Sequence, residues 1–260
     1  MEKLERNNIK DIQKAFGEQA QGFDTGNYHL SKAEYQEYMI KKTEPQSSDH
    51  LLEVAAGTCI CGRAYAPHVN HVTCLDATPV MLEVGKKEAE DAGIPNITFV
   101  KGIAEELPFL DNSFDIVISR LAFHHFVNPE EIFTEMKRVL KPGGKLVLMD
   151  MAPQKEELRA QIDKMEQMRD FSHVKELTTT EMRNLYEKNG MKLLTQECIK
   201  VPVSVEGWME LTHTPEEKRE ILRGKIKADI EGKMDTGFSP YSKENEIYFD
   251  HYWIFNMGIK

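Results

Sequence analysis

Two carboxylates and a pair of imidazoles stand where short apolar segments of this chain end. Glu53 lies in "LLEVA", Asp76 closes "HVTCLD", and the adjacent His124 and His125 follow "FDIVISR". A carboxylate accepts hydrogen bonds from hydroxyl and ammonium groups, and an imidazole can take up a proton near neutral pH. These four side chains are therefore the first candidates for binding and catalysis.

The segments that carry these residues predict a sheet of parallel strands. Short apolar runs alternate with amphipathic helical patterns, and this order favours parallel strands joined by right-handed helical crossovers. The expected strands are 51–55, 71–76, 97–102, 114–120 and 145–151, and the expected helices between them are 62–68, 77–93 and 129–144.

Both ends of the chain depart from this rhythm. Residues 1–42 predict one or two polar helices around a glycine-rich break, which we expect to form a lid. Residues 43–260 are expected to form the main domain, with an insertion around 154–232 that covers the substrate. Beyond Met151 the patterns predict helices at 154–169, 178–189 and 215–232, and strands at 191–205 and 246–260.

Ligands of open α/β sheets bind beyond the carboxyl ends of the strands, where Glu53 and Asp76 are expected. Asp76 is suited to accept hydrogen bonds from the two hydroxyls of a ribose, although a carboxylate there also stabilises the start of a helix. The loop after Glu53 lacks the glycine pattern of dinucleotide sites and the Lys-Ser/Thr of triphosphate loops. A nucleoside ligand without phosphates, such as S-adenosylmethionine, fits this loop better.

Four motifs in order resemble a known family. They are "LLEVAAGTC", "LDATPVML", "GIAEELPFLDNSFDIVISRLAFHHF" and "RVLKPGGKLVLMD", which together span about residues 50–151. They resemble the class I S-adenosylmethionine-dependent methyltransferases, and within these the menaquinone-biosynthesis type. The resemblance implies an α/β, Rossmann-like fold with a seven-stranded, mostly parallel sheet, helices on both faces and a helical lid or insertion.

The resemblance also implies roles for individual residues. Glu53 would hold the amino group of the cofactor's methionine part, directly or through water, and Asp76 would bind the ribose. The remaining cofactor-binding residues implied are Ala55, Ala56 and Gly57 under the cofactor, Ala77 and Met81 beside the adenosine, Ile103 and Ala104 at the adenine, and Ser119 and Arg120 near the methionine part.

Three positions depart from the family pattern. Ala55 and Cys59 replace glycines of the loop, and Ile103 replaces an aspartate that usually accepts the adenine amino group. An alanine at position 55 is tolerated without strain only where φ is negative. Ile103 is expected to offer apolar packing instead of a hydrogen bond.

Methyl transfer needs alignment of the acceptor with the methyl group, and often a base. His124 or His125 is the expected base or substrate orienter, with a packed core imidazole as the alternative. His173, Trp208 and Tyr28 are candidates for the substrate side of the site. The spacing of Cys59, Cys61, His68 and His71 matches no common zinc pattern, so no metal is expected.

The amino-acid composition limits the kinds of partner and the cellular location that we expect for this protein. The chain has 260 residues and a formal charge of −10, which disfavours nucleic acid and anionic membranes as partners. It has no apolar segment long enough to span a bilayer and only four cysteines, so a cytoplasmic protein with a small-molecule acceptor is expected. Two alternatives stay open, a cofactor-binding protein without transfer activity and a nicotinamide-dependent oxidoreductase.

Overall fold

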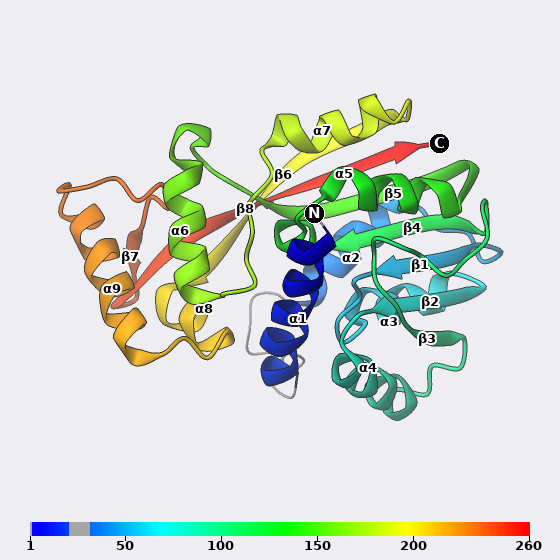
Figure 1. Cartoon of the computed structure of the whole chain (residues 1–260), viewed down its shortest axis with the longest axis horizontal. Helices are drawn as coiled ribbons and strands as arrows, with labels where there is room; N and C mark the ends of the chain where they lie inside the picture. The colour runs from blue at the N-terminus through cyan, green and yellow to red at the C-terminus, as the bar shows by residue number, and fades with distance from the viewer. Residues whose placement is uncertain (1, 21–31) are drawn as a thin grey trace.

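The computed structural model describes residues 2–20 and 32–260, and its centre is one mixed β-sheet (Figure 1). The strand order is β3-β2-β1-β4-β5-β8-β6, and the short β7 pairs with β8. Strands β1 to β5 are mutually parallel, whereas β8 runs antiparallel to both β5 and β6. The strands are β1 His50–Val54, β2 His71–Asp76, β3 Ile97–Lys101, β4 Phe114–Arg120, β5 Leu140–Ala152, β6 Lys192–Ser204, β7 Tyr241–Lys243 and β8 Glu246–Ile259.

This sheet confirms the predicted fold class, and the three-residue β7 extends the expected seven strands to eight. The described helices are α1 Glu2–Gln19, α2 Ala33–Thr43, α3 Ile60–Tyr65, α4 Pro79–Asp91, α5 Pro129–Val139, α6 Arg159–Arg169, α7 Thr179–Lys188, α8 Val205–Leu211 and α9 Glu216–Ile230. Helix α8 was not predicted, because its seven residues follow directly on a strand pattern. None of the helices in the described ranges is long and apolar enough to cross a membrane.

The central strands are apolar throughout because both faces of the sheet are covered. Leu51 packs into one hydrophobic cluster and its neighbour Leu52 into the other, on the opposite face. Ile116 and Val117 of β4 divide in the same way. Side chains alternate across a strand, so a strand buried on both sides needs an unbroken apolar run.

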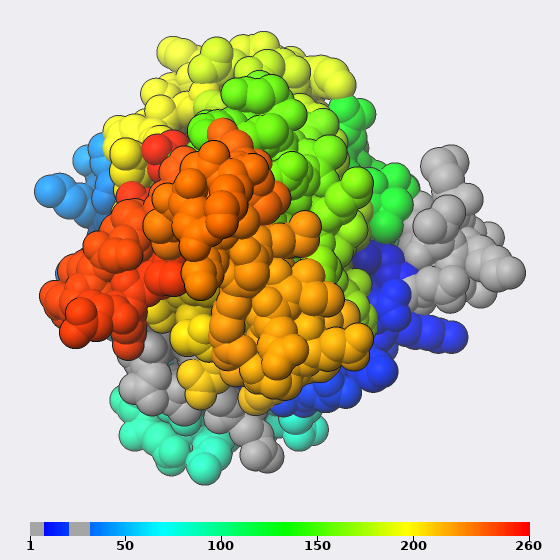
Figure 2. Space-filling model, turned by 90° about the vertical axis from the view of Figure 1, so that its left-hand side faces the viewer, coloured from blue at the N-terminus to red at the C-terminus, as the bar shows by residue number. Residues whose placement is uncertain are grey.

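The C-terminal half builds a second lobe on the extended end of β8. Helices α6, α8 and α9 share one hydrophobic cluster with this strand, and α9 lies on the outer surface at this end (Figure 2). Trp208 of α8, Trp253 of β8 and Ile226 of α9 are fully buried in one cluster. The lobe thereby brings the end of α6 towards the carboxyl ends of the parallel strands (Figure 1). The predicted lid role of residues 1–42 stays a prediction.

Gly85 in α4 sets how closely this helix approaches the loop after β1. A Cβ at Gly85 would lie 2.6 Å from the Thr58 carbonyl oxygen.

We expect Gly85→Ala to lower the free energy of unfolding by about 1–3 kcal/mol, because the loop must move. Gly224→Ala in α9 is the matched control, since a Cβ there meets nothing within 4 Å. It should raise the stability by about 0.5–1 kcal/mol. Equal urea midpoints for the two variants would contradict this close approach.

Candidate active site

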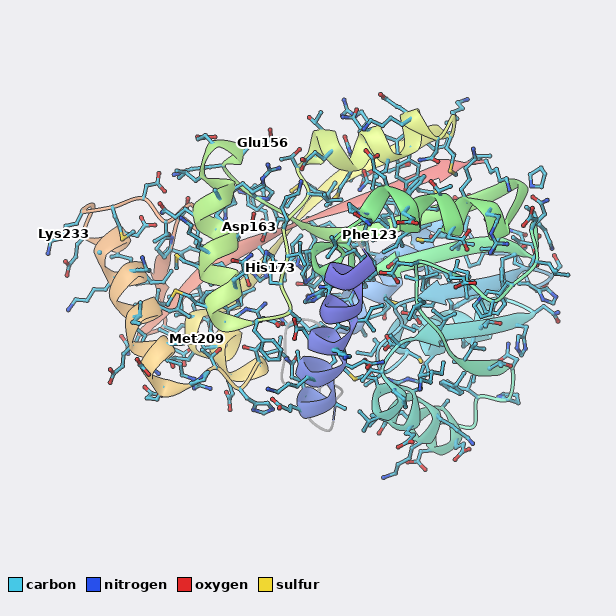
Figure 3. The ribbon with its side chains drawn as sticks, in the orientation of Figure 1. Phe123, Glu156, Asp163, His173, Met209 and Lys233 are labelled. Atoms are coloured by element: carbon cyan, nitrogen blue, oxygen red, sulfur yellow. The ribbon has the colours of Figure 1, made fainter. Side chains whose placement is uncertain are left out.

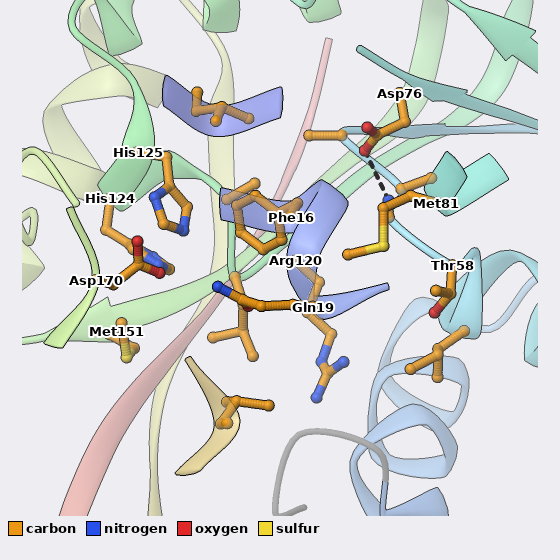
Figure 4. Close-up of a pocket in the computed structure, with 18 of the residues that line it drawn as sticks. Phe16, Gln19, Thr58, Asp76, Met81, Arg120, His124, His125, Met151 and Asp170 are labelled. Atoms are coloured by element: carbon orange, nitrogen blue, oxygen red, sulfur yellow. Dashed lines mark hydrogen bonds between the residues drawn. The ribbon is translucent and has the colours of Figure 1, made fainter. Parts of the chain in front are cut away.

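A cleft with about 1030 Å³ of empty space opens at the carboxyl ends of β1, β2 and β4 (Figure 4). Helix α1 lies across it and contributes Ile12, Phe16 and Gln19 to its lining. Asp76, Met81 and Thr58 lie at one end of the cleft, and His124, His125 and Asp170 lie at the other (Figure 4). The predicted residues that line it are Glu53, Ala55, Ala56, Gly57, Asp76, Met81, Arg120, His124 and His125.

Asp76 joins the ends of two neighbouring strands. Its Oδ2 accepts a 2.7 Å hydrogen bond from the Gly57 N–H (dashed in Figure 4), and its Oδ1 accepts one of 2.7 Å from the Thr78 N–H. Burial raises the pKa of Asp76, and these backbone hydrogen bonds oppose that shift. A carboxylate has about four lone-pair sites, so Asp76 can accept further hydrogen bonds from a ligand in the cleft.

Glu53 lies at the floor of the same cleft and is fully buried. Its Oε2 accepts a 2.7 Å hydrogen bond from the Gly62 N–H and a weak one of 3.6 Å from the Cys74 thiol. Burial raises the pKa of Glu53 to about 7, against the effect of these donors and of Arg120 and Arg63. Glu53 therefore changes its charge near neutral pH, where a nearby ammonium group would favour the carboxylate.

His124 at the other end is held by a buried carboxylate that the sequence did not single out. Its Nδ1 lies 2.6 Å from Oδ1 of Asp150, and this oxygen also accepts a hydrogen bond from the Met151 N–H. Oδ2 of Asp150 accepts hydrogen bonds from the N–H groups of Ala122 and Phe123. Because the imidazole beside it and the backbone donors outweigh burial, the pKa of Asp150 is lowered. An ionised Asp150 keeps the proton on Nδ1, which leaves Nε2 as the basic nitrogen.

The ring of His125 is held by other contacts than that of His124. Its ring lies edge-on to Phe16, with centroids 5.1 Å apart, and 4.1 Å from the ring of His124. Its Nδ1 is 3.1 Å from both the carbonyl oxygen and the hydroxyl of Ser172. Burial and the neighbouring His124 lower the pKa of His125 to about 3, so this imidazole is neutral and only weakly basic.

Other predicted residues lie around the cleft without lining it. Ala77 and Ile103 line a second cavity between α1 and the end of β3, where the Gln13 amide donates a 2.8 Å hydrogen bond to the Ala77 carbonyl. Ala104 and Ser119 are buried. Tyr28 lies outside the described residues.

His173 and Trp208 were expected on the substrate side, but the structure places both behind the wall of the cleft. Nε2 of His173 lies 2.9 Å from Oδ1 of Asp163 (Figure 3), and the indole N–H of Trp208 points at the Glu166 carboxylate. Nε2 of His173 and Nε1 of Trp208 thus have their partners inside the core. Neither residue is among those that line the cleft.

The sequence analysis did not identify several residues of the wall, among them an arginine, an aspartate and a histidine of the C-terminal half. Arg169 and Asp170 end α6, and His251 belongs to β8. Their positions follow from the C-terminal lobe, whose elements have no motif of their own. The described residues contain no group of three or more histidine, cysteine or acidic side chains that could hold a metal ion.

The chain is similar to known methyltransferases in sequence and in fold. A family model described as "Methyltransferase domain" matches residues 52–148, and a model described as "Anamorsin, N-terminal" matches residues 104–200. The uncharacterized methyltransferase YcgJ of Bacillus subtilis is 33% identical over 181 residues, which cover 69% of this chain and 72% of that protein. The crystal structure of YcgJ has a TM-score of 0.80, with 30% identity over 88% of this chain and 99% of that one.

The chain belongs to the class I methyltransferase family. A putative methyltransferase from Bacillus halodurans also has a TM-score of 0.80, at 27% identity, and covers 86% of this chain and 98% of that one. The demethylmenaquinone methyltransferase of Clavibacter sepedonicus is 34% identical over 140 residues, covering 53% of this chain and 56% of that protein. Members of this family use S-adenosylmethionine as the methyl donor.

The loop after β1 in this methyltransferase is strained at two positions. Ala55 has a φ of 54° and Cys59 a φ of 60°, so Ala55 does not have the negative φ that an alanine needs to avoid strain. The chain must turn sharply after β1 so that the Ala56 N–H reaches the Leu75 carbonyl at 3.0 Å. A left-handed conformation costs a non-glycine residue about 1–2 kcal/mol. The loop adopts the left-handed conformation at these residues despite that free-energy cost.

Replacing Ala55 by glycine should therefore release strain. We expect Ala55→Gly to raise the free energy of unfolding by up to about 1 kcal/mol, because the relief exceeds the extra chain entropy of glycine. Ala56→Gly is the control, since Ala56 is not among the residues with positive φ, and it should destabilise the protein. Denaturant unfolding checks both variants, and a loss of stability in Ala55→Gly equal to that of the control would refute the strain.

Proposed function

We propose that this protein is an S-adenosylmethionine-dependent methyltransferase that methylates a small-molecule acceptor. The observation that carries the proposal is the cleft itself. The buried carboxylate of Asp76 lies at one end, Glu53 also lines the cleft, and the imidazole of His124, held through Nδ1 by Asp150, lies at the other end. A nucleoside cofactor and an acceptor could therefore bind in line within one enclosed space.

The residues present fit the cofactor. Asp76 would accept hydrogen bonds from the ribose hydroxyls, and Glu53 would hold the amino group. Small side chains at 55–57 leave room for the cofactor over the loop, and Arg120 carries a positive charge suited to its carboxylate. The side chains proposed around the adenosine are Ala77, Met81, Ile103 and Ala104, with Ser119 beneath the methionine end. S-adenosylmethionine supplies a methyl group already activated on a sulfonium.

The residues of this chain would align the acceptor with the methyl group and remove a proton from the acceptor. His124 is favoured over His125 as the base because Asp150 keeps its Nδ1 protonated and its Nε2 basic. His125 serves better as a positioning residue, since its weakly basic ring is fixed between Phe16 and Ser172. Closure by α1 excludes water, which keeps acceptor and methyl group together.

Asp76→Asn tests the cofactor site. The amide removes the negative charge and places an N–H group against the backbone donors, so we expect the affinity for S-adenosylhomocysteine to fall by about tenfold or more. Asp91→Asn at the exposed end of α4 is the control and should bind as the parent does. Isothermal titration calorimetry measures both. Unchanged affinity in Asp76→Asn would remove the basis of the proposal, and stabilisation by NAD(H) alone would favour an oxidoreductase.

Glu53 should make cofactor affinity depend on pH. Below its pKa of about 7 the side chain must lose a proton before it can pair with an ammonium group. We therefore expect the affinity for S-adenosylhomocysteine to rise with pH, by up to about tenfold per unit, and to level off above that pKa. Glu53→Gln should abolish the slope. A parent profile that is flat across this pH range would show that Glu53 does not pair with the ligand.

His124→Asn tests the base. We expect the rate of methyl transfer to fall by about 10²–10⁴-fold, with unchanged affinity for S-adenosylhomocysteine. The exposed His68→Asn is the matched control and should retain the parent's rate. Transfer of a labelled methyl group into a small-molecule extract measures the rate. Full activity in His124→Asn would reject the assigned base, and binding without transfer in the parent would indicate a cofactor-binding protein.

A further inference from the structure

Arg169 places two uncompensated hydrogen-bond donors at the far end of the cleft. It lines the cavity, yet only 8% of its surface is exposed. Its Nε donates a 2.8 Å hydrogen bond to Oε2 of Glu166. The two terminal nitrogens of the guanidinium have no hydrogen-bond partner among the described residues. Because Arg169 lines the cleft and these nitrogens have no protein acceptor, they are available as donors to a ligand that enters it.

Glu166 fixes the direction of this guanidinium. It is fully buried and also receives the indole N–H of Trp208, at 3.2 Å from Oε1 and 3.3 Å from Oε2. The guanidinium itself lies over the Trp208 ring, 5.5 Å from its centroid. These contacts leave the flat fork of terminal nitrogens free for a planar pair of oxygens, which is the geometry of a carboxylate.

Asp170 adds an acceptor next to this fork. Its Oδ1 takes both the N–H of Ser172, at 2.9 Å, and the hydroxyl of Ser172, at 2.6 Å. Its Oδ2 receives no hydrogen bond from the part of the chain that the structure describes. The Asp170 carboxylate lies on the same side of the cavity as His124 and His125 (Figure 4). A ligand here thus meets a donor fork, an acceptor oxygen and a base.

We propose that the methyl acceptor is a monocarboxylate that also carries an amine or hydroxyl group. Arg169 binds its carboxylate through the two terminal nitrogens, and Asp170 accepts a hydrogen bond from the amine or hydroxyl near Nε2 of His124. This inference rests on the proposed methyltransferase function, because it names the class of acceptor for the same site.

The local charges favour one carboxylate over a phosphate dianion. Arg169 faces the carboxylates of both Glu166 and Asp170, and Asp150 lies behind His124. The lowered pKa values of His125 and His251 keep these two rings uncharged. Among the described residues of the cleft, only Arg120 adds another permanent positive charge. A dianion would therefore lack counter-charge, whereas a carboxylate with a nearby ammonium adds no net charge.

Acetate, the simplest carboxylate, tests the fork directly. With saturating S-adenosylhomocysteine, sodium acetate should raise the Tm of the parent by about 2 °C over sodium chloride of equal ionic strength. Arg169→Lys keeps the charge but loses the planar fork, so it should lose most of this shift. Arg183→Lys on the surface of α7 should keep it. A parent shift no larger with acetate than with chloride, or an equal shift in Arg169→Lys, would overturn the proposal.

A chemical test of the acceptor complements the acetate experiment. Labelled methyl transfer into a small-molecule extract should fall by more than about tenfold after the carboxyl groups of the extract are converted to amides, because Arg169 then lacks its anion. Phosphatase treatment should leave the transfer unchanged. Transfer that survives amidation, or that requires phosphate, would overturn the proposal. Absence of transfer to the untreated extract would instead contradict the methyltransferase activity, and the acetate experiment would still decide the role of Arg169.

Discussion

The hydrogen bond between the Gly57 N–H and the Asp76 carboxylate is the contact on which the cleft depends. It ties the loop after β1 to the end of β2, the neighbouring strand, at 2.7 Å. A loop held in this way must turn sharply, which explains the positive φ of Ala55, Gly57 and Cys59. The same carboxylate keeps lone pairs for a ligand, so one side chain both shapes the site and is available to bind in it.

Different kinds of chemical group form the two ends of the cleft. At the end that holds Asp76, backbone groups and small side chains define the space, and the carboxylates of Asp76 and Glu53 accept hydrogen bonds from the N–H groups of Gly57 and Gly62. At the end that holds His124, ionisable side chains from β5, α6 and the segment after β4 hold one another in place. The first arrangement suits one cofactor shared by a family. The second can change with the acceptor, because its side chains come from separate elements.

The sequence located the cleft residues at the ends of β1, β2 and β4 but not those of the C-terminal lobe, for physical reasons. Strands buried on both faces produce unbroken apolar runs, so β1, β2 and β4 and the residues at their ends could be located from their patterns. Asp150 also ends such a run, but its role appears only when β5 is paired beside β4. Arg169 and Asp170 reach the cleft through the packing of a lobe that has no periodic signal pointing to the site.

Two misplaced expectations have a common origin. His173 and Trp208 were assigned to the substrate side from their chemistry, yet Nε2 of His173 and the indole N–H of Trp208 bind Asp163 and Glu166 within the core. The sequence cannot distinguish a polar aromatic that faces a cavity from one that supports the wall behind it. Here Trp208 and Glu166 fix Arg169, so the wall depends on residues that do not touch the cavity.

The most direct measurement is a crystal structure of the protein grown with S-adenosylhomocysteine. The account predicts that both ribose hydroxyls lie within hydrogen-bonding distance of the Asp76 carboxylate, with the sulfur directed towards the end of the cleft that holds His124. A nucleoside bound elsewhere, or a sulfur directed away from His124 with Asp76 contacting only its own backbone donors, would contradict it.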